Sequence, residues 1–145
     1  MHTCMDSHPF LLLIAEDDAD DVFMMESVLK STHADWQYIF FSNGNDLIYY
    51  LLHPSPAEPL PVSLILLDIN MPRKDGMQTL TEIRKIPAYA TVPVVGFSTS
   101  VATFMVQQFL ESGGTYFLQK PDTYDQLQEL VARLPGIIQN SLTDR

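Results

Sequence analysis

Short runs of consecutive apolar residues recur along this 145-residue chain and constrain its fold more than any other feature. The clearest runs are 10–15 and 64–67, and segments with helical periodicity separate such runs. A continuous apolar run is typical of a strand that is buried on both faces, whereas a half-exposed strand alternates apolar and polar residues. Doubly buried strands are parallel and need crossover helices on both faces. The sequence therefore predicts a doubly wound α/β fold.

The same pattern of apolar runs and helical periodicity predicts five strands that alternate with five helices. The strands are expected at 10–15, 36–41, 64–68, 92–98 and 116–119, and the helices at 20–31, 45–52, 77–85, 101–112 and 123–133. Asp20 or Asp21 is expected to cap the first helix, and Pro135-Gly136 to end the last one. Four prolines between His53 and Val62 predict an extended loop.

Length and composition fit one domain with one core, because 46% of the residues are hydrophobic. We expect a flexible N-terminus at 1–8, a domain at 9–134 and a tail at 135–145. The formal net charge of −10 disfavours general binding to nucleic acid or to an anionic membrane. A single cysteine, Cys4, excludes an intramolecular disulfide and a cysteine-based zinc site. With no signal-peptide pattern and no apolar run of about 20 residues, the expected location is cytoplasmic.

Polar residues follow the predicted strands at the point where each strand ends. Glu16 and Asp17 follow the first strand, and Asp68 ends the third. Ser98 ends the fourth strand, and Lys120 follows the fifth. In a doubly wound fold the carboxyl ends of the strands meet at one edge, where ligands bind. These five side chains are therefore expected to gather at one site.

The chemistry of these residues suits phosphoryl transfer. Three carboxylates close together repel one another, and a hard divalent cation such as Mg²⁺ relieves that repulsion through oxygen ligands. The cation would also stabilise charge during phosphoryl transfer. Asp68 is then a nucleophile that forms an acyl phosphate, while the Ser98 hydroxyl and the Lys120 ammonium suit oxygens of the transferred group.

Taken one at a time, these residues have simpler interpretations. The acidic run after the first strand fits a helix N-cap equally well, and Asp18, Asp20 and Asp21 are assigned to that role. Ser98 alone is more often a turn residue, and Lys120 alone is more often a surface charge. Only the full set, in this order and at these strand ends, favours function.

Four stretches of the sequence resemble the receiver domain of two-component response regulators. They are LLIAEDD at 12–18, LLDINMPRKDG at 66–76, VPVVGFSTS at 92–100 and YFLQKP at 116–121. The resemblance covers about 9–134 and implies a flavodoxin-like sheet with strand order 2-1-3-4-5. It also implies that Glu16 and Asp17 hold Mg²⁺ directly or through water, with Mn²⁺ as a substitute. Asp68 is then both a ligand and the phosphorylated residue, and the backbone carbonyl of Asn70 completes the protein ligands.

The resemblance assigns further roles around the site. Ser98 is the switch hydroxyl and Phe117 the switch aromatic, although Phe117 fits a plain core residue almost as well. Asn70 and Ser100 occupy positions that tune dephosphorylation. The Lys120-Pro121 peptide bond is expected to be cis, and Gly76 is expected to have a positive φ in the loop before its helix.

The expected function is that of a stand-alone receiver that switches partner binding, with no enzymatic activity beyond its own phosphorylation and dephosphorylation. A histidine kinase or a phosphotransfer protein would be the donor, and Val22 and Phe23 form a candidate docking face, unless they only cover the sheet edge. The downstream target is a protein that the sequence does not identify. A homodimer through the fourth helix, fifth strand and fifth helix is a further expectation.

Two other classes compete with this interpretation. An interaction module with a dead site would lack Asp68, the acidic pair or Lys120, and all of these are present. A phosphatase of the haloacid-dehalogenase type would have a second aspartate where Asn70 stands. Nucleotide or flavin binding lacks a glycine-rich loop after the first strand. The four histidines, His2, His8, His33 and His53, are expected to be solvated and not metal ligands.

Overall fold

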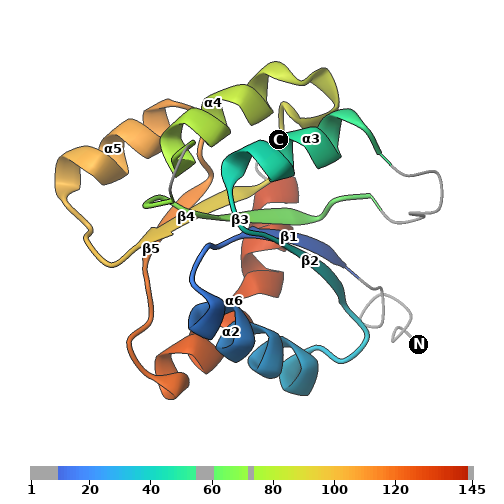
Figure 1. Cartoon of the computed structure of the whole chain (residues 1–145), viewed down its shortest axis with the longest axis vertical. Helices are drawn as coiled ribbons and strands as arrows, with labels where there is room; N and C mark the ends of the chain where they lie inside the picture. The colour runs from blue at the N-terminus through green and yellow to red at the C-terminus, as the bar shows by residue number, and fades with distance from the viewer. Residues whose placement is uncertain (1–9, 55–60, 72–73, 144–145) are drawn as a thin grey trace.

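The computed structural model describes residues 10–54, 61–71 and 74–143. Within these residues, five parallel strands form one sheet in the order β2-β1-β3-β4-β5. Helices cover both faces of this sheet (Figure 1). The doubly wound α/β fold and its predicted strand order are therefore confirmed.

The strands are β1 (Leu11–Ala15), β2 (Gln37–Phe41), β3 (Leu64–Asp68), β4 (Val94–Ser98) and β5 (Tyr116–Gln119). β3 and β5 have the predicted bounds, whereas the other three begin one or two residues later than predicted. Every residue of β1, β3 and β4 is buried, which explains their continuous apolar sequences. β2 and β5 form the two edges of the sheet and are partly exposed.

The helices are α2 (Ala19–Thr32), α3 (Gly44–Leu52), α4 (Gly76–Lys85), α5 (Thr103–Glu111) and α6 (Tyr124–Thr143), with a short 3₁₀ turn η1 (Pro87–Tyr89). α2 and α6 pack on one face of the sheet against residues such as Leu12, Ile14 and Leu66. α3, α4 and α5 pack on the other face, against residues such as Leu13 and Leu67. Figure 1 shows this division into three layers.

Asp18 caps α2, as one of the three residues assigned to the cap, whereas the narrower prediction that Asp20 or Asp21 is the cap is wrong. One carboxylate oxygen of Asp18 accepts hydrogen bonds from the backbone N–H groups of Asp20, at 2.9 Å, and Asp21, at 3.1 Å. The helix begins at Ala19, so these two N–H groups belong to its second and third residues, which an N-cap side chain satisfies. The side chains of Asp20 and Asp21 are consequently not needed as caps.

The prediction that Pro135 and Gly136 end the last helix is also wrong, because α6 runs through both to Thr143. Proline has no N–H, so the carbonyl of Val131 loses its helical donor. The Nε2 atom of His33 lies 3.1 Å from that carbonyl oxygen and donates in its place. His33 is thus partly buried and stacks on Trp36, and is not the solvated residue expected. Ile137 and Ile138 are buried in the core, so the packed part of the fold extends beyond residue 134.

Gly76 does not have the positive φ that was predicted; among the glycines of the described residues only Gly113 does, with φ of 108°. The constraint at Gly76 is space, since a Cβ there would lie 2.6 Å from Cδ1 and 2.7 Å from Cα of Ile69. Gly113 follows the C-cap residue Ser112 of α5, where a positive φ is typical of a helix end.

Some sequence predictions fall on residues that the structure does not describe. The N-terminus at 1–8, with His2, Cys4 and His8, lies outside the described residues, as do residues 55–60 of the proline-rich loop. Among the described residues, none of the helices has the length and apolar character that a membrane span requires.

Candidate functional site

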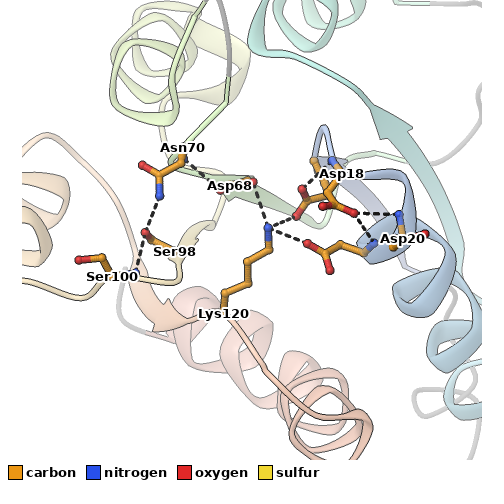
Figure 2. A network of polar contacts seen from close by, with 9 residues as sticks. Asp18, Asp20, Asp68, Asn70, Ser98, Ser100 and Lys120 are labelled. Atoms are coloured by element: carbon orange, nitrogen blue, oxygen red, sulfur yellow. Dashed lines mark hydrogen bonds and ion pairs between the residues drawn. The ribbon is translucent and has the colours of Figure 1, made fainter.

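The carboxyl ends of four strands bring the predicted polar residues together. Glu16 and Asp17 follow β1, Asp68 ends β3, Ser98 ends β4 and Lys120 follows β5. Figure 2 shows Lys120 extending towards Asp68 from one side, with Asn70 and Ser98 on the other side. The sheet topology alone causes this convergence, because parallel strands end at the same edge.

Glu16, Asp17 and Asp68 form a group suited to a divalent cation. Each residue offers a carboxylate oxygen, and these oxygens lie within 4.8 Å of one another. Glu16 and Asp68 are buried, with 2% and 3% of their surface exposed, and Asp17 is exposed to solvent. Oε1 of Glu16 is buried and has an ion-pair contact to Lys120 but no hydrogen bond of good geometry. Such an atom can still accept a ligand, and three carboxylates are the oxygen donors that hard divalent cations prefer.

Burial raises the pKa of the Glu16 carboxyl to about 7. The negative charge of Asp68 acts in the same direction, while the ion pair with Lys120 and the hydrogen bond from the backbone N–H of Asp18 oppose it. The site therefore holds a carboxyl whose charge changes near neutral pH unless a cation is present.

The ammonium of Lys120 lies among three carboxylates. Nζ is 2.8 Å from Oε1 of Glu16, 2.9 Å from Oδ2 of Asp21 and 3.2 Å from Oδ2 of Asp68. Burial alone would lower the pKa of Lys120, but its interactions with Glu16, Asp21 and Asp68 raise it instead. Lys120 therefore remains charged and can neutralise negative charge beside Asp68.

The predicted dephosphorylation residue Asn70 contacts the predicted switch residue Ser98. Nδ2 of Asn70 donates to Oγ of Ser98 at 3.0 Å, and the backbone N–H of Ser100 donates to the same oxygen at 3.2 Å. The backbone N–H of Asn70 also donates to Oδ1 of Asp68 at 3.0 Å. Asn70 thus connects the Asp68 carboxylate with the buried Ser98 hydroxyl.

Phe117 is partly buried and packs edge-on against Phe109 of α5, with the ring centroids 5.4 Å apart. This position satisfies a core role, and the switch role of Phe117 stays a prediction. The peptide bond between Lys120 and Pro121 is trans, so the expectation of a cis bond is wrong. A trans bond is the lower-energy form of most X–Pro peptides.

One site residue, Asp21, was assigned a different role by sequence reasoning. Asp21 was placed with the helix cap, yet its carboxylate contacts Lys120. No local pattern could have revealed this, because Lys120 comes from the opposite end of the chain. Of the candidate docking residues on α2, Phe23 is 73% exposed and Val22 is partly buried.

The model of the response regulator receiver domain matches residues 12–132, which is most of the chain. This chain belongs to the receiver family. The predicted resemblance is therefore confirmed. The three carboxylates and Lys120 lie at the carboxyl ends of the strands of a receiver sheet.

Several receivers resemble this one along much of its length. Response regulator Rcp1 of Synechocystis sp. is 36% identical over 93 residues, which span 63% of this chain and 63% of Rcp1. The crystal structure of Rcp1 in its Mn²⁺-bound form is 31% identical, with a TM-score of 0.73, and the match covers 85% of this chain and 89% of that chain. The phosphorylated cyanobacterial phytochrome response regulator RcpA is 25% identical, with a TM-score of 0.78, covering 95% and 97%.

Proposed function

We propose that this chain is a receiver that accepts a phosphoryl group on Asp68 from a histidine kinase or a phosphotransfer protein. One observation carries the proposal. The buried Asp68 carboxylate belongs to a cluster of three carboxylates suited to a divalent cation. It also lies 3.2 Å from the Lys120 ammonium. A carboxylate beside the Lys120 ammonium and within a site for a divalent cation can attack an electrophilic phosphorus atom, because both positive charges would offset the repulsion from the incoming phosphoryl group.

The transfer step follows from this placement. An oxygen of Asp68 forms a bond to the phosphorus atom as the bond from phosphorus to the histidine nitrogen breaks, and the electron pair returns to the imidazole. Lys120 donates hydrogen bonds to the oxygens of the transferred group, where negative charge concentrates. Oγ of Ser98 accepts hydrogen bonds from Asn70 and from the backbone of Ser100, which leaves its own O–H as a donor for an oxygen of the transferred group.

Glu16, Asp17 and Asp68 are the residues that would hold Mg²⁺, and the carbonyl of Asn70 is assigned to the same set by family resemblance. When bound, Mg²⁺ supplies charge neutralisation for the phosphoryl group and for the carboxylates. The Mn²⁺-bound form of Rcp1 supports a divalent metal at this site, and Mn²⁺ should replace Mg²⁺.

The output of the site is a change in partner binding, and its only chemistry is the phosphorylation and dephosphorylation of Asp68. The phosphorylated form of RcpA supports this role. Because that relative is a phytochrome response regulator, a phytochrome-type histidine kinase belongs among the donors to be tested. The protein would act in the cytoplasm, and a homodimer through α5, β5 and α6 stays part of the proposal.

The test of the acceptor is the intact mass of the protein after incubation with acetyl phosphate. We expect a phosphoryl adduct on the wild type with Mg²⁺ and none with EDTA. Asp68→Asn should form no adduct, because an amide oxygen is a poor nucleophile. Asp20→Asn removes an exposed carboxylate from the same rim, meaning the edge of the molecule where the carboxyl ends of the strands meet. This variant should form the adduct normally. An adduct of equal yield on Asp68→Asn would refute Asp68 as the acceptor.

A further inference from the structure

Lys120 has one more anionic partner than its proposed role requires. Glu16 and Asp68 are both buried, and together they already fix the ammonium beside the acceptor. The third partner, Asp21, comes from the first turn of α2, and its side chain is 41% exposed. Its 2.9 Å contact to Nζ is shorter than the 3.2 Å contact that Nζ makes to Asp68.

The fold itself does not need the carboxylate of Asp21. Asp18 caps α2, and Asp21 contributes only its backbone N–H to that cap. Asp20, in the same turn, provides an equal charge near the helix N-terminus. The ion pair with Lys120 is therefore the distinguishing feature of the Asp21 side chain.

We propose that Asp21 is a positioning residue that restrains Lys120, competing with the phosphoryl group on Asp68 for the lysine ammonium. The inference rests on the proposed function and deepens it. The Lys120 ammonium lies within 3.2 Å of carboxylate oxygens of Glu16, Asp21 and Asp68. It has only three N–H donors to share among these carboxylates and any phosphoryl oxygen.

A phosphoryl group on Asp68 must take over part of this coordination. Glu16 is buried, so breaking its ion pair would leave a buried charge unpaired. Asp21 is exposed enough to be solvated when Lys120 leaves it, so the Asp21 contact is the one given up. The cost of that exchange opposes phosphorylation, and its removal should speed adduct formation.

The test compares three variants of the full chain by the initial rate of adduct formation from acetyl phosphate with Mg²⁺. Asp21→Asn should react about two- to fivefold faster than the wild type, the size expected from a partly exposed ion pair. Asp20→Asn removes the same charge from the same helical turn without a contact to Lys120, so it should change the rate much less. Asp21→Glu keeps a carboxylate and should stay near the wild-type rate.

Equal rates for Asp21→Asn and Asp20→Asn would overturn the inference, because the effect would then be one of general charge. A slower Asp21→Asn protein would overturn it as well, since Asp21 would then assist Lys120. If the wild type forms no adduct, the proposed function fails at its own test.

A second measurement keeps the inference testable in that case. The nuclear magnetic resonance signal of the Lys120 ammonium, assigned with Lys120→Arg, should shift in Asp21→Asn and stay in place in Asp20→Asn. An unchanged ammonium signal in Asp21→Asn would refute the contact itself. The amide spectrum of each variant reports whether it is folded.

Discussion

At the scale of single residues, the burial of Glu16 gives the site a pH dependence. Its carboxyl has a pKa of about 7 in the folded protein, against an ordinary value of 4.5. Between those values the folded state retains a proton that the unfolded chain has released. This contribution to stability is therefore complete below about pH 4.5 and is lost as the pH rises through about 7.

We accordingly expect the Glu16 contribution to the free energy of unfolding of the metal-free protein to fall between about pH 4.5 and about pH 7 and to level off above that range. The measurement is urea denaturation in EDTA at several pH values, for the wild type and for Glu16→Gln. Glutamine resembles the protonated carboxyl and does not titrate, so the difference between the two proteins isolates Glu16. Parallel pH profiles for the two proteins would show that the carboxyl of Glu16 titrates normally.

Single residues also show how far sequence reasoning reached into the site. Glu16, Asp68 and Lys120 were predictable because each stands at the end of an apolar strand, where topology fixes its surroundings. The role of Asp21 was not predictable, because a residue in the first turn of a helix has a sufficient local explanation as a cap. The contact from Asn70 to Ser98 depends on side-chain rotamers, which a sequence pattern does not specify.

At the scale of elements, α6 continues through Pro135 because the end of α2 supplies the missing hydrogen bond. The carbonyl of Val131 can only accept, so Nε2 of His33 must carry the proton in their 3.1 Å contact. Sequence rules treat proline as a helix stop because they assume that the freed carbonyl has no other donor. Here that donor is the C-cap residue of another helix, which explains why the predicted end at Pro135 was wrong.

We predict that His33→Ala lowers the free energy of unfolding by about 1–3 kcal/mol, since it leaves the Val131 carbonyl without its donor. His53→Ala is the matched control, because His53 also follows a helix and contacts a backbone carbonyl, but is exposed. Its effect should stay within about 0.5 kcal/mol. Urea denaturation followed by circular dichroism measures both.

Pro135→Ala sharpens this experiment. An alanine restores a backbone N–H for the carbonyl of Val131, so the cost of His33→Ala should be smaller in that background. If His33→Ala costs the same in the wild type and in the Pro135→Ala background, His33 acts only through its stacking on Trp36.

At the scale of the whole molecule, negative charge is concentrated at the rim, where the carboxyl ends of the strands meet. Glu16, Asp21 and Asp68 contact the Lys120 ammonium, and Asp17 adds a further carboxylate beside Glu16 and Asp68, in a chain whose formal net charge is −10. Repulsion within this group acts against folding, because the unfolded chain separates the same charges. A divalent cation that binds only the folded state should therefore stabilise the entire domain.

The expected result is a rise in the melting temperature with Mg²⁺ or Mn²⁺. At about ten times the dissociation constant, binding contributes about 1.4 kcal/mol, or roughly 3–5 °C for a domain of this size. Asp17→Asn should reduce the rise, because Asp17 is an exposed member of the carboxylate group whose loss leaves the core intact. Differential scanning calorimetry measures the rise, with a potassium salt of equal ionic strength as the control. Equal rises in the wild type and in Asp17→Asn would show that the cation binds elsewhere.

The position of Trp36 decides what fluorescence can reveal about this protein. Trp36 is the only tryptophan of the sequence, and it precedes β2, at the end of the sheet opposite to the rim. Its indole stacks on His33, with the ring centroids 3.7 Å apart, and meets Phe10 edge-on. Metal occupancy at the rim alone should therefore leave its emission unchanged. A change of emission upon phosphorylation would instead signal that the rearrangement has reached the far end of the layer formed by α2 and α6.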